Sequence, residues 1–243
     1  MRSHHVTDRA AGFTLVELTI VLVIVALLIG GMLLPLSAQR DLQSISETEK
    51  QLSEIKEALT GFATINGRLP RPANSATDGT ERSVCSNDAD CTGFIPWQAL
   101  GIQATDSWNK LIRYAVSPSF SNSTFSLSTK ATKKIQTRDS AGNTAYLFGQ
   151  ASCTNPTDNL CSPAVIFSQG KQRFGTSTDG VTLSGGTATS IDEAANDSGG
   201  GVSFMSRTAT DNTAAAGGEF DDIVTWISPV VLFNRMVAAG KLP

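Results

Sequence analysis

The hydropathy pattern of this chain changes abruptly near Arg40. From Leu18 to Gln39 the sequence holds 22 residues without a single charge, and apolar residues dominate the first part of that run. At a rise of about 1.5 Å per residue, such a helix is about 33 Å long, enough to cross the hydrocarbon layer of a bilayer. We therefore expect a transmembrane helix over residues 13–35.

Gly30, Gly31 and Pro35 are expected to interrupt this helix, because proline removes a backbone donor and crowds the preceding turn. Over residues 36–66 a helical pattern resumes, and Gly67 ends it. Apolar residues recur there at spacings that place one stripe along an otherwise polar helix, namely Leu42, Ile45, Leu52, Ile55, Leu59, Phe62 and Ile65. The pattern predicts an amphipathic helix that packs on the chain's own sheet.

The remainder, residues 67–243, alternates short apolar runs with turn formers, and its composition suits a loop-rich β or α+β head. Of the two we expect an α+β head with an antiparallel sheet. Strands are expected at residues 108–116, 125–127, 145–149, 165–168 and 223–227. A hairpin turn is expected at 139–143. Residues 176–218 are rich in Gly, Ser and Thr and predict an extended, poorly packed excursion. A serine followed by Pro229 predicts a final helix over residues 230–239.

Charge adds little to this picture. The formal net charge is −3, and removing residues 1–12 takes away two arginines and one aspartate, which leaves 17 basic and 21 acidic residues, or −4. Such a balance gives no strong attraction to nucleic acid, which is not expected as a partner. Four basic residues lie close in sequence, namely Lys130, Lys133, Lys134 and Arg138. We interpret them as a solvated surface in preference to a DNA-binding patch.

The cysteines are Cys85, Cys91, Cys153 and Cys161, and turn formers flank each sequence-local pair. An even number of cysteines beyond a membrane signal indicates disulfides in an oxidising compartment. Three connectivities are possible. Cys85–Cys91 with Cys153–Cys161 is favoured, because near neighbours close short loops at little entropic cost. Metal binding by the thiols is the alternative, although no C-x-x-C spacing occurs and no histidine follows His5.

Few residues suit catalysis. Without histidine in the rest of the chain, Ser-His-Asp, Cys-His and histidine–zinc sites are excluded, and we expect no catalytic residue, cofactor or metal. Glu219, Asp221 and Asp222 lie close in sequence, but neighbours on a strand point to opposite faces, so a solvated edge or cap is favoured. Asp88 and Asp90 are typical of a turn. Calcium is the alternative for either group.

The segment Gly12-Phe13-Thr14-Leu15-Val16-Glu17-Leu18 opens the apolar run. Glu17 is the only charge between Arg9 and Arg40, and a carboxylate at the edge of a bilayer is costly unless it is paired. Basic residues before the run favour a cytoplasmic N-terminus. A secretory signal would have an apolar core of about 7–15 residues and a small-x-small cleavage site, which residues 36–38 do not supply.

This segment resembles the processing site of type IV pilins and of type II secretion pseudopilins. The resemblance implies a pilin-like fold, a leader of residues 1–12 that prepilin peptidase cuts between Gly12 and Phe13, and methylation of Phe13. It also implies that Glu17 pairs with the amine of Phe13 in a neighbouring subunit. The implied partners are prepilin peptidase, other pilin or pseudopilin subunits, the inner-membrane assembly platform and the lipid bilayer.

The resemblance therefore predicts a structural subunit without enzymatic activity. It would be single-pass in the bacterial inner membrane with its head in the periplasm, or in a pilus or pseudopilus after assembly. A head of residues 67–243 is large for a major subunit, which favours a minor one. The alternative is a membrane-anchored periplasmic enzyme or binding protein that does not polymerise.

Overall fold

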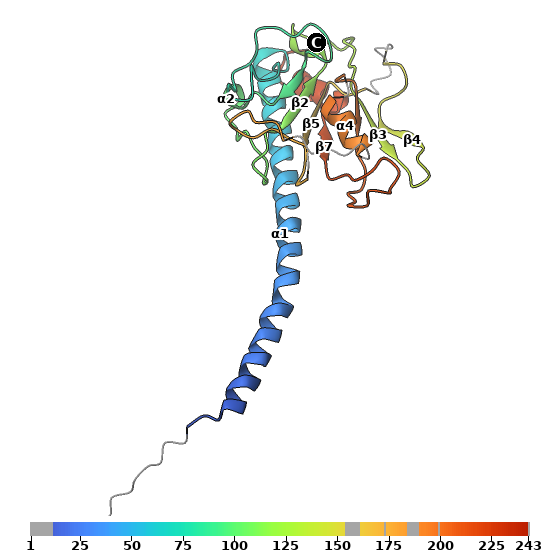
Figure 1. Ribbon diagram of the computed structural model, residues 1–243. Coiled ribbons are helices and arrows are strands. Elements are labelled where there is room, and N and C mark those ends of the chain that lie inside the picture. The colour runs from blue at the N-terminus through green and yellow to red at the C-terminus, as the bar shows by residue number, and fades with distance from the viewer. Residues whose placement is uncertain (1–11, 154–160, 173, 184–189, 199, 243) are drawn as a thin grey trace, which may run out of the picture. The chain divides into compact units, whose positions relative to one another are not determined.

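The computed structural model describes residues 12–153, 161–172, 174–183, 190–198 and 200–242, with the side chains of residues 31–36 outside that description. The predicted leader thus lies outside the described residues, except for Gly12. The chain divides into two compact units, Met1–Gln43 and Ser44–Pro243, and each is described by itself. One long helix, α1 (Leu15–Asn66), contributes residues to both (Figure 1).

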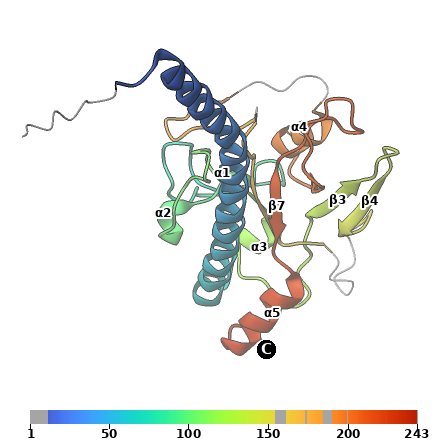
Figure 2. The same cartoon turned by 90° about the horizontal axis from the view of Figure 1, so that it is seen from below.

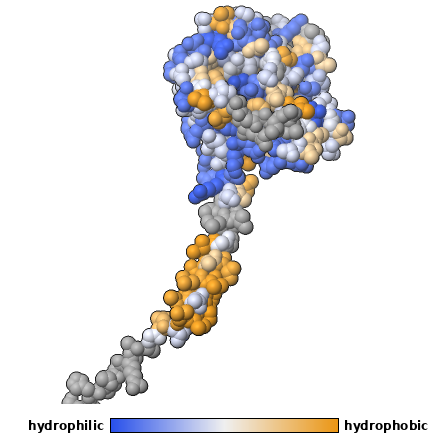
Figure 3. Space-filling model, in the orientation of Figure 1, coloured by the Kyte–Doolittle hydropathy of each residue, from blue (hydrophilic) through white to orange (hydrophobic). Residues whose placement is uncertain are grey.

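The first unit holds the N-terminal part of α1. Its large apolar side chains from Phe13 to Ile29 are between 43% and 89% exposed, and they form the apolar surface visible in Figure 3. Among the side chains that the structure describes, no helix offers a stretch both long and apolar enough to cross a membrane. The predicted transmembrane segment, residues 13–35, extends into the residues whose side chains are not described.

The interruption expected at Gly30, Gly31 and Pro35 is absent, because the backbone of α1 is helical through all three. Proline removes one backbone donor from a helix interior at a cost of about 3 kcal/mol, but it does not forbid the turns on either side. The prediction that the helix ends at Gly67 is confirmed. Gly67 has a φ of 72°, and its N–H donates to Ala63 O at 2.8 Å.

The second unit begins within α1, whose remaining turns are amphipathic. Leu52, Ile55 and Leu59 of the predicted stripe are buried. Leu42 in the first unit and Ile65 near the helix end are 67% and 74% exposed, so the stripe is shorter than predicted.

The main sheet of the second unit has four antiparallel strands in the order β1-β2-β5-β7. They are β1 (Thr92–Phe94), β2 (Arg113–Val116), β5 (Ala164–Ser168) and β7 (Ile223–Trp226). The protein is therefore α+β, with the N-terminal helix packed on an antiparallel sheet, as predicted. Strand β5 lies inside this sheet and all five of its residues are buried, which explains its unbroken apolar sequence.

A second sheet has the order β4-β3-β6. Its strands are β3 (Lys134–Arg138), β4 (Thr144–Phe148) and β6 (Ser203–Met205). The β3–β4 hairpin turns at the predicted place, where Asp139 N–H donates to Asn143 O at 3.0 Å. The β3–β6 pair is parallel, which departs from the expectation of a purely antiparallel head.

Two apolar clusters hold these layers together. The first joins the second-unit part of α1 to one face of the main sheet and to the C-terminal helix, and includes Leu52, Ile55, Leu59, Tyr114, Val116, Ile166, Leu232, Phe233 and Met236. The second joins the opposite face of that sheet to the smaller sheet, through Ala115, Ile135, Val165, Phe167 and Phe204. Successive residues of β2 and β5 thus alternate between the clusters, as the pleat of a strand requires. Figure 2 shows β3 and β4 across β7 from α1.

Four shorter helices complete the fold, namely α2 (Trp97–Leu100), α3 (Pro118–Ser121), α4 (Ile191–Ser198) and α5 (Pro229–Ala238). Helix α5 confirms the predicted C-terminal helix. Two expectations are wrong. Residues 125–127 form no strand, and the region 176–218, which includes masked residues, contains α4 and β6 instead of being wholly extended.

Replacing Leu59 by alanine tests the packing of α1 on the main sheet. Leu59 is fully buried, so Leu59→Ala is expected to lower the free energy of unfolding by about 2–5 kcal/mol, measured by urea denaturation of the detergent-solubilised protein. Ile65→Ala is the matched control and should change it by no more than about 0.5 kcal/mol. Equal effects of the two variants would show that this face of the helix is not the packed one.

Candidate functional site

The start of α1 is closed by a reciprocal pair of side chains. Glu17 Oε2 accepts hydrogen bonds from Thr14 N–H at 3.0 Å and from Thr14 Oγ1 at 2.9 Å. In return, Glu17 N–H donates to Thr14 Oγ1 at 3.2 Å. This is a capping box, which satisfies backbone donors at the first turn of the helix. The sequence analysis missed it, although a threonine followed three residues later by a glutamate is its usual signal.

The two residues before the cap have no structural role of their own within the described chain. Phe13 is 89% exposed. A Cβ added to Gly12 would meet no atom of the described residues within 4 Å. Packing against the described part of the chain therefore does not require glycine at this position.

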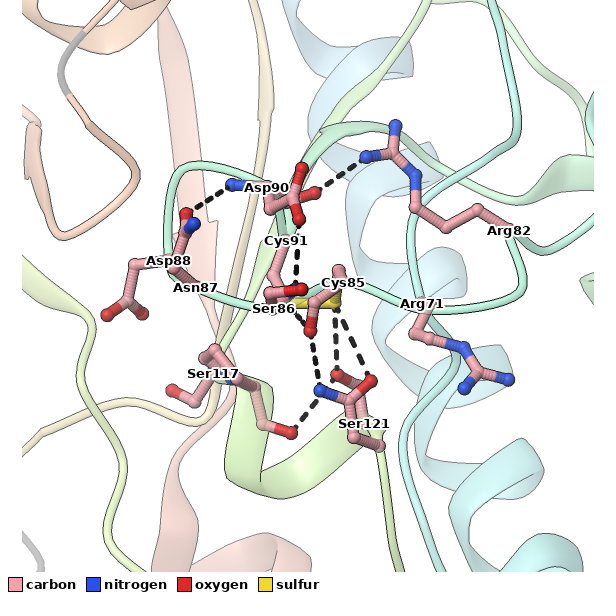
Figure 4. Close-up of a disulfide and its surroundings, with 12 residues drawn as sticks. Arg71, Arg82, Cys85, Ser86, Asn87, Asp88, Asp90, Cys91, Ser117 and Ser121 are labelled. Carbon is pink, nitrogen blue, oxygen red and sulfur yellow. Dashed lines mark hydrogen bonds between the residues drawn. A yellow bond between two sulfur atoms is a disulfide. The ribbon is translucent and has the colours of Figure 1, made fainter.

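Both disulfides are present in the sequence-local pairing that loop closure favours. Cys85 and Cys91 have Cα atoms 5.0 Å apart, and those of Cys153 and Cys161 are 5.9 Å apart. Figure 4 shows the first disulfide beside Ser121 of α3. Cys85 O accepts a hydrogen bond of 2.6 Å from Nδ2 of Asn122, the residue that follows this helix. The disulfide thus fastens the loop before β1 onto the body of the second unit.

The two aspartates of this loop serve protein contacts. Asp90 Oδ2 accepts from Ser86 N–H at 3.0 Å, which favours the turn interpretation. Asp88 Oδ1 accepts from Lys133 Nζ at 2.7 Å. Lys133 is fully buried, and burial lowers its pKa although Asp88 opposes the shift. The interpretation of the basic group as a solvated surface is therefore wrong for Lys133, and also for Arg138, which pairs with buried Asp192 at 2.9 Å.

A second ionic contact lies within the loop that follows α1. Glu81 accepts from both guanidinium Nη atoms of Arg68, and its Oε1 accepts from Arg71 N–H at 2.8 Å. Burial alone would raise the pKa of Glu81, but these hydrogen bonds and the two positive charges outweigh it, so the pKa lies below its ordinary value.

An acidic cluster is buried between α4 and the segment before β7. It consists of Glu193, Asp221 and Asp222, and one carboxylate oxygen of each lies within 4.8 Å of one oxygen of each of the others. Glu193 is 2% exposed and Asp222 7%. Burial raises the pKa of Glu193 to about 7, and it also raises the pKa of Asp221 and of Asp222. The nearby charge of Asp221 raises the pKa of the other two carboxylates further.

The expectation of a solvated edge or cap for these acidic residues is therefore wrong. Asp221 and Asp222 precede β7, which starts at Ile223, so the alternation of a strand does not separate their side chains. Glu219, the third residue of that predicted group, is also buried. Glu193 was missed, because no pattern in the sequence connects it to residues almost thirty positions later.

Residues 7–33 match the protein family described as the prokaryotic N-terminal methylation motif. This motif is the signature of type IV pilins and pseudopilins that are made as prepilins, a structural class of protein. It implies processing by prepilin peptidase and assembly with other pilin subunits. No curated protein and no solved structure matches the chain.

The contact of Glu81 predicts a pH dependence. A carboxyl group whose pKa is lowered on folding stabilises the protein above its unfolded pKa of about 4.5, and this contribution is lost as the pH falls through the folded value. Glu81→Gln is expected to lower the free energy of unfolding by about 1–3 kcal/mol at neutral pH, and by less as the pH falls below about 4.5.

Urea denaturation across this pH range measures the difference. Glu57→Gln is the control, because Glu57 pairs with Arg235 at 3.5 Å in an exposed position and should matter little at any pH. A loss in Glu81→Gln that stays constant down to acidic pH would contradict the assignment.

Proposed function

We propose that this chain is a structural subunit, of the minor type, of a type IV pilus or a type II secretion pseudopilus. Prepilin peptidase cuts it between Gly12 and Phe13, and the new amine of Phe13 is methylated. Residues 13–35 anchor it in the inner membrane and carry residues 67–243 as a periplasmic head. The observation that carries this proposal is the methylation motif at residues 7–33, which runs into an uncharged apolar helix.

Gly12 supports the cleavage step. Because no contact with the described residues requires glycine there, a requirement for it would come from a partner that approaches the backbone closely. A peptidase active site is such a partner. Phe13, which follows it, is exposed and accessible for cleavage and methylation.

Glu17 supports assembly through α1. In the single chain its carboxylate is bound by Thr14, which offers a hydroxyl and an amide N–H but no positive charge. In a bilayer, a carboxylate without a counter-charge is costly, and so is an isolated ammonium group. Pairing of Glu17 with the amine of Phe13 in a neighbouring subunit neutralises both charges and fixes the stagger of adjacent helices.

The size of the head supports a minor subunit. The main sheet already covers the apolar stripe of α1, so β3, β4 and β6 form a further layer that this packing does not need. Strand β4 has four exposed residues, among them Tyr146 at 43% and Leu147 at 50%. Such surface is available for contacts with other subunits.

Mass spectrometry of the mature protein tests processing. We expect an N-terminus at Phe13 that carries a methyl group, and we expect Gly12→Val to keep the uncleaved Met1 terminus, because a branched side chain would obstruct the peptidase. A mature wild-type protein that begins at Met1, or after Ala38, would contradict the proposal.

Substitution of Glu17 tests assembly separately. Glu17→Ala is expected to be cleaved and methylated normally, yet its incorporation into purified filaments should fall at least about tenfold, equivalent to about 1.4 kcal/mol, because the Phe13 amine loses its counter-charge. Glu49→Ala removes an exposed carboxylate from the same helix outside the apolar run and is the control. Incorporation of Glu17→Ala at the control level would refute the pairing.

A further inference from the structure

The buried acidic cluster has an unusual pattern of satisfied and unsatisfied oxygens. Glu193 Oε1 accepts from Asp221 N–H at 2.9 Å, Asp221 Oδ2 accepts from Gln172 N–H at 2.7 Å, and Asp222 Oδ2 accepts from Asn196 Nδ2 at 2.7 Å. One oxygen of each carboxylate is therefore fixed by a hydrogen bond.

A second oxygen of each carboxylate is buried and accepts no hydrogen bond from a described N–H or hydroxyl donor. These atoms are Glu193 Oε2, Asp221 Oδ1 and Asp222 Oδ1. The side chains of Glu193 and Asp221 also lie close enough to hydrogen-bond each other when one of them holds a proton. A buried, unpaired carboxylate oxygen costs at least about 1–3 kcal/mol, and three close together add mutual repulsion. Native proteins seldom retain such groups without a ligand or a role.

The nearest buried cation does not resolve this cost. The positive charge of Lys110 acts on Asp221, but Lys110 Nζ donates to backbone carbonyl oxygens, that of Gln169 at 3.1 Å and that of Gln172 at 2.6 Å. Lys110 therefore orders the loop after β5 beside the cluster, and no described salt bridge joins it to the three carboxylates.

The geometry points to a calcium site formed by Glu193, Asp221 and Asp222, which is a binding function beyond filament assembly. Calcium binds oxygen ligands at about 2.3–2.6 Å, so two ligands on opposite sides of one ion are about 4.6–5.2 Å apart. One oxygen of each of the three carboxylates lies within 4.8 Å of one oxygen of each of the others, which is within the span of one such sphere. Magnesium keeps several waters and is usually bound through one or two carboxylates, so a set of three protein carboxylates suits calcium better.

The backbone of the loop after β5 approaches the cluster closely. Gly170, in the loop after β5, has a φ of 57°, and a Cβ there would lie 2.5 Å from Asp221 Oδ1. Glycine thus lets the backbone approach the unpaired oxygen without a side chain to block it. A bound ion would connect α4, the loop after β5 and the segment before β7 in one contact.

Calcium titration of the full-length mature protein in detergent tests the site. After treatment with a chelating resin, raising free calcium to about a hundredfold above its dissociation constant should raise Tm by roughly 5–10 °C at neutral pH. Isothermal titration calorimetry should give one ion per chain. Magnesium at the same concentration should raise Tm by less than half as much.

Glu193→Gln and Asp222→Asn should each abolish the calcium-dependent rise, since each replaces a charged ligand by an amide of similar shape. Asp211→Asn, an exposed carboxylate that accepts from Gln172 Nε2, is the matched control and should keep the rise. Near-ultraviolet circular dichroism checks that each variant is folded.

Two results would overturn the site. One is a wild-type Tm that calcium does not change; if Glu193→Gln then stabilises the protein, Glu193 and Asp221 share a proton instead. The other is a full calcium response in both Glu193→Gln and Asp222→Asn, which would place the ion elsewhere. Neither of these results depends on cleavage at Gly12 or on filament assembly.

Discussion

The free-energy cost of a carboxylate beside an uncharged apolar helix is the constraint on which the proposed processing and assembly of this protein depend. In the single chain, Thr14 meets part of that cost by forming a capping box with Glu17. That cap supplies hydrogen bonds but no counter-charge, so it is adequate in water and insufficient in a bilayer. Cleavage before Phe13 would create the missing positive charge, which links processing, membrane anchoring and assembly through one ion pair.

The second unit shows how part of α1 is built into a folded body. The stripe of Leu52, Ile55 and Leu59 joins the main sheet, and the opposite face of that sheet buries β3 and β6 through Phe167 and Phe204. Loops are a large share of this unit, and they are fastened by two disulfides and by buried charges. A calcium ion at the acidic cluster would extend the same strategy to α4.

Features set by local sequence could be predicted, and those set by distant contacts could not. The helix end at Gly67, the turn at Asp139 and the helix after Pro229 follow from backbone preferences of nearby residues. The position of β6 does not, because Phe204 is buried by strands far away in the sequence. The acidic cluster could not be predicted for the same reason. Asn196 hydrogen-bonds both Met205 and Asp222, and these contacts between distant residues cannot be read from the composition. The motif at Glu17 was recognisable because its residues are contiguous.

In-cell photo-crosslinking from the head tests the central claim most directly. Val84 is 60% exposed and beside the Cys85–Cys91 disulfide, so a photoreactive residue there would sample neighbours without disturbing the core. Mass spectrometry of the adducts should identify mainly other pilin-like chains, as a minor subunit of a filament requires. Adducts mainly between copies of this chain would contradict the minor role, and adducts without any pilin-like partner in cells that assemble filaments would contradict the filament itself.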